Sequence, residues 1–160
     1  MIRSGREPLA VLVQPVLTGA AALTIGRRAR PLENRLFTVG PREPAILRAL
    51  GVGRFGRMLD RTGWNRRITR LRAYDGTRAG LASLDQHTRR SELVHLAGTA
   101  GGVTVAAAVL LRGAPRGAAG LLASTIVLQL YPALLQRLVR ARIQRVRCRE
   151  RASGHGKLEG

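Results

Sequence analysis

The chain of 160 residues has very little cysteine and few aromatic residues. Cys148 is the only cysteine, which excludes an intrachain disulfide and a CxxC metal site. Aromatic residues make up 3% of the chain, whereas nucleic-acid modules that stack bases depend on aromatic rings. No cofactor motif and no metal-ligand spacing occurs, so we expect neither a bound cofactor nor a metal ion.

Acidic residues are scarce as well. The 9 acidic residues stand against 28 basic ones, and the net charge is +19. Such an excess favours phosphate partners, either nucleic acid or lipid headgroups. Apolar residues are concentrated in three blocks with arginines between them, whereas a soluble domain interleaves the two at helical or strand spacing. We therefore predict a membrane protein whose partners are membrane lipids and not nucleic acid; a soluble arginine-rich nucleic-acid binder is the alternative.

The two strongest apolar segments are Leu93–Leu111 and Gly117–Leu135. Each has about 19 residues, which as a helix span roughly 28 Å, close to the thickness of a bilayer's hydrocarbon core. The connection Arg112–Gly117 is short, so the two helices are expected to be antiparallel neighbours in a transmembrane hairpin. Gly98 and Gly102 form a G-x-x-x-G pattern, which lets a neighbouring helix approach closely.

The part of the chain before this hairpin has a weaker apolar block and a basic segment. Pro8–Ile25 is predicted to be a membrane anchor, with a secretory signal peptide as the alternative. Gly26–Arg90 mixes arginines with small apolar groups, a pattern typical of helices that lie on a headgroup surface; a solvated linker is the alternative. Within it, Glu43–Leu50 is predicted to be a short helix that ends at Gly51.

These patterns predict an all-α integral membrane protein with three transmembrane helices. The last two form the antiparallel hairpin, and amphipathic interfacial helices lie between the first and the second. The predicted division is 1–26 (membrane anchor), 27–90 (basic cytoplasmic or interfacial segment), 91–142 (hairpin with the active site) and 143–160 (basic, partly disordered tail). Arginines crowd the middle segment and the tail, so the positive-inside rule predicts a multi-pass protein of the cell membrane with its N-terminus outside and its C-terminus cytoplasmic.

Two polar groups are predicted to meet at one end of the hairpin. Glu92 and His95 are three residues apart and share a helix face. The carboxylate can orient the imidazole and stabilise its protonated form, and the imidazole can deprotonate a hydroxyl. Gln136, Arg137 and Arg140 follow on the facing helix, where the arginines could hold a phosphate or an oxyanion. The alternatives are interfacial residues without a function and stop-transfer arginines; a di-iron site needs a second E-x-x-H that the chain lacks.

The segments that carry these residues resemble a known family. T-R-R-S-E-L-V-H, residues 88–95, and Y-P-A-L-L-Q-R-L-V-R-A-R, residues 131–142, resemble the glycosyl-4,4'-diaponeurosporenoate acyltransferase family. The resemblance extends over roughly Leu36 to Arg145, with Gln129 where the family has Asn and with Leu138 and Val139 as further departures. It implies a small membrane enzyme of carotenoid-glycoside biosynthesis that moves a fatty acyl group to a sugar hydroxyl of a lipid or carotenoid glycoside.

The resemblance also implies roles for individual residues. His95 is the expected general base and Glu92 its orienting partner, while Gln136, Arg137, Arg140 and Tyr131 are the expected substrate-binding residues. An acyl thioester is the expected co-substrate and a lipid-linked glycoside the expected acceptor, with a homo-oligomer or a biosynthetic complex as a further partner. The alternative function is a non-catalytic membrane scaffold of a lipid-synthesis complex.

Overall fold

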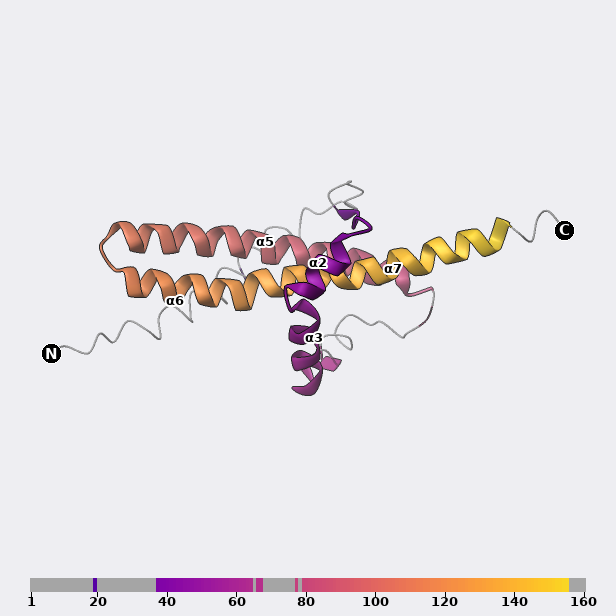
Figure 1. Ribbon diagram of the computed structural model, residues 1–160, viewed down its shortest axis with the longest axis horizontal. Helices are drawn as coiled ribbons and strands as arrows, with labels where there is room; N and C mark the ends of the chain where they lie inside the picture. The colour runs from indigo at the N-terminus through magenta and orange to yellow at the C-terminus, as the bar shows by residue number, and fades with distance from the viewer. Residues whose placement is uncertain (1–18, 20–36, 65, 68–76, 78, 156–160) are drawn as a thin grey trace. The chain divides into compact units, whose positions relative to one another are not determined.

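The computed structural model describes residues 19, 37–64, 66–67, 77 and 79–155. The elements in chain order are α2 (Glu43–Ala49), α3 (Val52–Arg61), α5 (Leu81–Leu111), α6 (Pro115–Thr125), the π-helical segment η2 (Ile126–Leu130) and α7 (Tyr131–His155) (Figure 1). No strand occurs among the described residues, which confirms the predicted all-α class. The predicted membrane anchor, Pro8–Ile25, falls almost wholly outside the described residues, as do residues 68–76 of the predicted interfacial segment.

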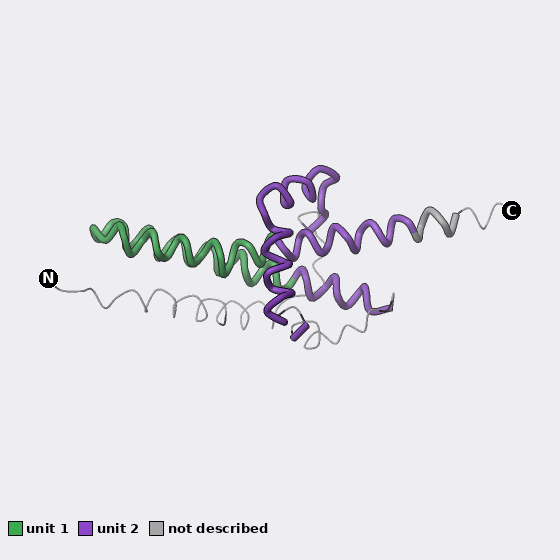
Figure 2. Tube along the Cα trace, turned by 60° about the horizontal axis from the view of Figure 1, so that its bottom comes forward, with its two compact units in different colours: residues 1–30, 90–134 green, residues 31–89, 135–160 purple. Residues whose placement is uncertain are grey.

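The chain divides into two compact units (Figure 2). Unit 1 comprises residues 1–30 and 90–134, and unit 2 comprises residues 31–89 and 135–160. Unit 2 therefore joins described segments that are far apart in the sequence. The four-part division by function stays a prediction.

Two helical segments among the described residues are long and apolar enough to cross a membrane. The first is α5, with 31 residues, and the second runs from Pro115 to Arg149, with 35 residues. Helix α5 begins at Leu81, well before its apolar part. Length and apolar composition thus agree with the two strongest apolar blocks of the sequence.

Within unit 1, the later part of α5 and α6 lie side by side, joined by a turn with Gly113 at φ 76° (Figure 1). Glycines of α5 meet polar side chains of the facing helix. A Cβ at Gly98 would lie 2.7 Å from the amide carbon of Gln129, and a Cβ at Gly102 would lie 2.8 Å from Cγ2 of Thr125. The contacts step by four residues in opposite directions along the two helices, which is an antiparallel register. The small-residue face therefore admits a neighbouring helix, as the G-x-x-x-G pattern predicts.

The helix that follows the turn is not regular throughout. Ile126–Leu130 is π-helical, and Pro132 comes two residues after it. Proline has no N–H, so the carbonyl four residues earlier, that of Leu128, cannot receive the usual helical hydrogen bond from this position. A π turn is one way in which a helix accommodates such a break without ending.

Unit 2 contains the short helices α2 and α3. Pro44 occupies the first turn of α2, where no N–H is needed, and Gly51 follows the helix with φ 79°, a conformation that glycine adopts without strain. The predicted short helix and its glycine stop are thereby confirmed. Leu47 and Val52 are buried, whereas Ile46 and Leu50 remain more than half exposed.

Candidate active site

Glu92 is a buried acidic side chain of unit 1, with 1% of its surface exposed. It belongs to α5, and His95 lies one helical turn further on the same face. Burial of a carboxylate costs several kcal/mol unless charge and hydrogen bonds compensate it. A buried carboxylate one helical turn from an imidazole, inside a helix of membrane length, therefore marks the first candidate cluster.

The imidazole of His95 has a partner on the facing helical segment. Its Nδ1 lies 3.0 Å from Oε1 of Gln129, which is 1% exposed and belongs to the π segment. Tyr131 begins α7 two residues later and is half-buried. Unit 1 thus contains Glu92, His95 and Tyr131 of the predicted site, together with Gln129.

In unit 2, Arg137 of α7 holds Glu43 at the start of α2. The guanidinium donates from Nε to Oε1 and from its terminal nitrogen to Oε2, the latter at 3.0 Å. The N–H of Gly40 also donates to the same carboxylate. Hydrogen bonding by Arg137 lowers the pKa of Glu43 below its usual value, although partial burial acts in the opposite direction. The paired ends of this bridge are far apart in the sequence, so it fixes α2 against α7.

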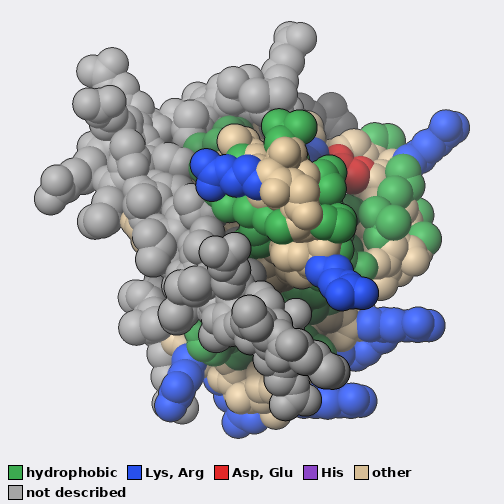
Figure 3. Space-filling view, turned by 90° about the vertical axis from the view of Figure 1, so that its left-hand side faces the viewer, with side chains coloured by type: hydrophobic (Ala, Val, Ile, Leu, Met, Phe, Trp, Pro, Cys, Tyr) green, Lys and Arg blue, Asp and Glu red, His purple; other side chains and the backbone are tan. Residues whose placement is uncertain are grey.

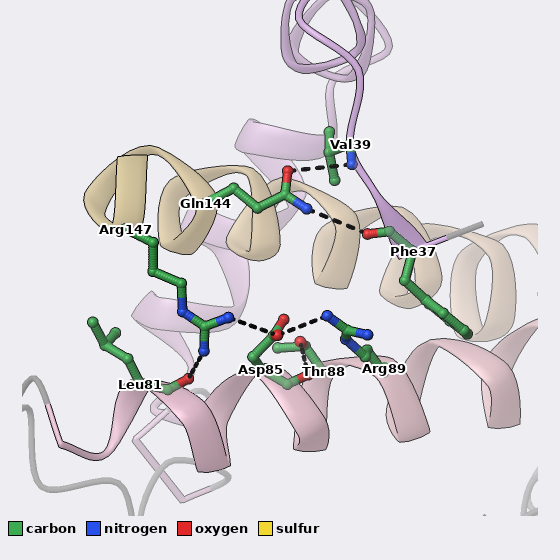
Figure 4. Close-up of polar contacts among 8 residues, drawn as sticks. All are labelled: Phe37, Val39, Leu81, Asp85, Thr88, Arg89, Gln144 and Arg147. Atoms are coloured by element: carbon green, nitrogen blue, oxygen red, sulfur yellow. Dashed lines mark hydrogen bonds and ion pairs between the residues drawn. The ribbon is translucent and has the colours of Figure 1, made fainter. Parts of the chain in front are cut away.

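A second ionic cluster of unit 2 is centred on Asp85 of α5 (Figure 4). Its Oδ2 accepts from Arg89 at 2.9 Å and from Arg147 of α7 at 3.2 Å. The side chain of Asp85 is 8% exposed. Gln144, one turn before Arg147, bonds the backbone of the segment that precedes α2, through the N–H of Val39 and the carbonyl of Phe37.

Arg140 is fully buried in unit 2. Its guanidinium carbon lies 5.1 Å from the centroid of the Phe37 ring, within the range of a cation–π contact. Gln136, four residues earlier on α7, is 8% exposed. These two residues are therefore enclosed side chains rather than solvated surface residues.

The predicted site residues fall into two sets. Glu92, His95 and Tyr131 belong to unit 1, whereas Gln136, Arg137 and Arg140 belong to unit 2. That all of them line one site stays a prediction. The sequence did not indicate that Gln129 contacts His95, and it did not single out Asp85. Both are polar residues in helices, like many others in this chain, and only their contacts in the structure show that they belong to the polar clusters.

Among the described residues, no group of three or more His, Cys, Asp or Glu side chains is placed to hold a metal ion. The polar clusters are instead built from arginine–carboxylate pairs and from one amide–imidazole contact. Such groups can bind anions and move protons.

The part of the chain that the structure describes is helical, with two helices of membrane length and the buried carboxylates Asp85 and Glu92. The glycosyl-4,4'-diaponeurosporenoate acyltransferase family matches residues 29–149, which is most of the chain. The chain belongs to this family, and the family supports a general acyltransferase role. Comparison with curated proteins and with solved structures finds no further match.

Proposed function

We propose that this protein is a membrane acyltransferase that moves a fatty acyl group from a thioester donor to a sugar hydroxyl of a lipid or carotenoid glycoside. The observation that carries the proposal is the burial of Glu92, at 1% exposure, one turn from His95 in a helix of membrane length. Ionisable groups in such helices are costly, and they commonly mark functional sites. Membership of an acyltransferase family supplies the reaction class.

His95 acts as the general base in this proposal. It takes the proton of the sugar hydroxyl while the hydroxyl oxygen attacks the thioester carbonyl. The tetrahedral intermediate then collapses, the carbon–sulfur bond breaks, and the thiolate leaves with the proton that His95 returns. The negative charge of Glu92, on the same helix face, stabilises the imidazolium that forms between these two steps.

Gln136, Arg140 and Tyr131 are the proposed contacts to the acyl donor. A buried guanidinium such as that of Arg140 can bind a phosphate or an oxyanion more strongly than a solvated one, because water does not screen it. Arg137 already holds Glu43 from two nitrogens. We therefore assign Arg137 to the placement of α2 in the working enzyme.

We further propose that α5 and the segment from Pro115 cross the membrane as a hairpin. Only 17% and 28% of their most apolar windows are buried within the chain, whereas the core helix of a soluble protein is mostly buried. Large apolar side chains such as Leu96, Val103 and Leu110 are at least 42% exposed. Hydrophobic and basic side chains also reach the surface together on the face drawn in Figure 3. Lipid would cover the apolar ones and attract the basic ones.

The proposed orientation places the turn outside the cell and the C-terminal part of α7 on the cytoplasmic side. Cys148, the only cysteine and an exposed residue of α7, offers a native probe. A membrane-impermeant maleimide should label Cys148 only after the cells are opened. Gly113→Cys in a Cys148→Ser background should be labelled in intact cells. The opposite pattern would contradict the orientation, and labelling of both sites in intact cells would contradict the hairpin.

The activity is tested with the full chain in detergent or nanodiscs, with radiolabelled palmitoyl-coenzyme A as the donor probe and glycosyl-4,4'-diaponeurosporenoate as the acceptor probe. His95→Ala should lower acyl transfer on the order of a hundred-fold or more, and Glu92→Gln should lower it as well. His87→Ala, a change on the same helix outside the proposed machinery, is the matched control.

Circular dichroism of each variant shows whether its helices are retained. Full transfer by a folded His95→Ala protein would refute the assignment of the base. If His95→Ala restored the acylated lipid in a deletion strain, the result would favour the non-catalytic scaffold instead.

A further inference from the structure

We propose that Gln129 is a positioning residue that holds the His95 imidazole with its proton on Nδ1, and that Gly98 is the gap that admits the Gln129 amide. The inference rests on the proposed function, because it explains how His95 is prepared to act as a base. It is carried by the 3.0 Å contact between Nδ1 of His95 and Oε1 of Gln129, and by the space that the missing side chain of Gly98 leaves.

The chemistry of the two groups decides the direction of the hydrogen bond. An amide oxygen accepts hydrogen bonds and cannot donate one. Nδ1 of His95 therefore carries the proton and donates to Oε1 of Gln129. In a neutral imidazole the lone pair then belongs to Nε2, which becomes the nitrogen that accepts the proton of a hydroxyl. One hydrogen bond thus fixes both the tautomer and the rotation of the ring.

Gly98 makes this contact sterically feasible. A Cβ on residue 98 would lie 2.7 Å from both Cδ and Oε1 of Gln129 and 3.1 Å from Nε2. The two distances of 2.7 Å are shorter than side-chain atoms tolerate, so an alanine here would push the amide aside. The displaced atoms form the end of a flexible side chain. Gly98→Ala should therefore move the amide without moving the two backbones.

The burial of Gln129 supports a role for its amide. The side chain is 1% exposed, and a buried amide without a partner costs roughly 1–3 kcal/mol. It also lies in the π segment, an irregularity that is rare in helices and frequent at functional positions. An apolar residue would fill the same space at lower cost if packing were the only requirement.

The first test reads the tautomer directly. The full chain is labelled with 15N-histidine in detergent micelles, and His87→Gln and His155→Gln leave His95 as the only imidazole. At a pH where the ring is neutral, the 15N shifts should report one tautomer with the proton on Nδ1. Gln129→Met keeps the length of the side chain but removes the amide, and it should give a mixture of both tautomers. Gly98→Ala should give a similar mixture, whereas Gly120→Ala, in open space on α6, should change nothing.

The second test measures acyl transfer with the donor and acceptor probes named above. Gln129→Met and Gly98→Ala should each lower kcat on the order of ten- to a hundred-fold with little change in KM, because the base is mispositioned while the substrates still bind. The double variant should agree with Gln129→Met alone within about twofold, since Gly98 acts only through the amide.

The outcomes separate this inference from the proposed function. If the wild-type chain transfers no acyl group, the proposed function fails, and the tautomer measurement still decides whether Gln129 orients His95. If the wild-type chain is active and Gln129→Met keeps both the tautomer and kcat, the inference is overturned. It is also overturned if the two variants affect kcat independently of each other, because Gly98 then acts by another route.

Discussion

Gly102→Ala is expected to destabilise unit 1, because the alanine methyl group would clash with the side chain of Thr125. Its Cβ would lie 2.8 Å from Cγ2 and 3.1 Å from Cβ of Thr125, with Oγ1 closer still. Thr125 is 1% exposed, and its hydroxyl donates to the carbonyl of Leu121 at 2.7 Å. Rotation of the threonine would break that bond and leave its Cβ in place. The clash therefore has to be relieved by separation of the two helices.

The magnitude follows from a comparison with Gly120→Ala. A Cβ at Gly120 meets nothing within 4 Å, and both variants gain the same helix propensity of roughly 1 kcal/mol over glycine. The difference between them therefore isolates the cost of overpacking, about 1–3 kcal/mol. For a chain of this size, that difference corresponds to a Tm that is about 2–12 °C lower for Gly102→Ala than for Gly120→Ala.

Thermal unfolding in detergent, followed by circular dichroism, measures both Tm values under one set of conditions. Thr125→Ala removes Oγ1 and Cγ2, so the double variant Gly102→Ala/Thr125→Ala should recover most of the lost stability. Equal Tm values for the two single glycine variants, or no recovery in the double variant, would show that the helices are not packed through Gly102 and Thr125.

Two further predictions concern the ionic contacts of unit 2. Because hydrogen bonding from Arg137 lowers the pKa of Glu43, the bridge stabilises the fold above the usual pKa of 4.5, and this stabilisation is lost as the pH falls through the lowered value. Glu43→Gln should therefore flatten the acid side of a plot of Tm against pH. An unchanged plot would show that the bridge does not stabilise the fold. Asp85→Asn should destabilise the chain by about 1–3 kcal/mol, because it removes the charge that two arginines share. Arg147→Gln should cost less in the same unfolding assay, since Arg147 is 37% exposed, and a larger loss for Arg147→Gln would contradict this ranking.

Helices could be predicted because their signals are local. Apolar runs of membrane length predicted the two long helices, and Gly51 predicted the end of α2. The G-x-x-x-G pattern predicted a close approach but not the partner of each glycine. That pairing depends on the axial register of two helices, which no local pattern contains.

Side-chain pairing could not be predicted for the same reason. In a regular α-helix the faces of residues beyond Leu130 would follow 3.6 residues per turn, whereas Ile126–Leu130 is π-helical. A π turn takes up about one extra residue, so positions beyond it are rotated by about 100° from the expected face. The bridge from Arg137 to Glu43 joins residues 94 positions apart. No local pattern in the sequence indicates that Arg137 pairs with Glu43, and its predicted role in substrate binding stays a prediction.

The choice of an amide at residue 129 can be argued from the cost of charge. Glu92 already places one buried carboxylate on the face that carries His95. A second carboxylate at residue 129 would add several kcal/mol of desolvation and a repulsion between like charges. A neutral hydrogen bond changes the free energy of unfolding by only about 1 kcal/mol and requires no counter-charge. An amide in the space beside Gly98 can therefore orient an imidazole in an apolar helix pair and leave the charge of Glu92 to stabilise the protonated ring.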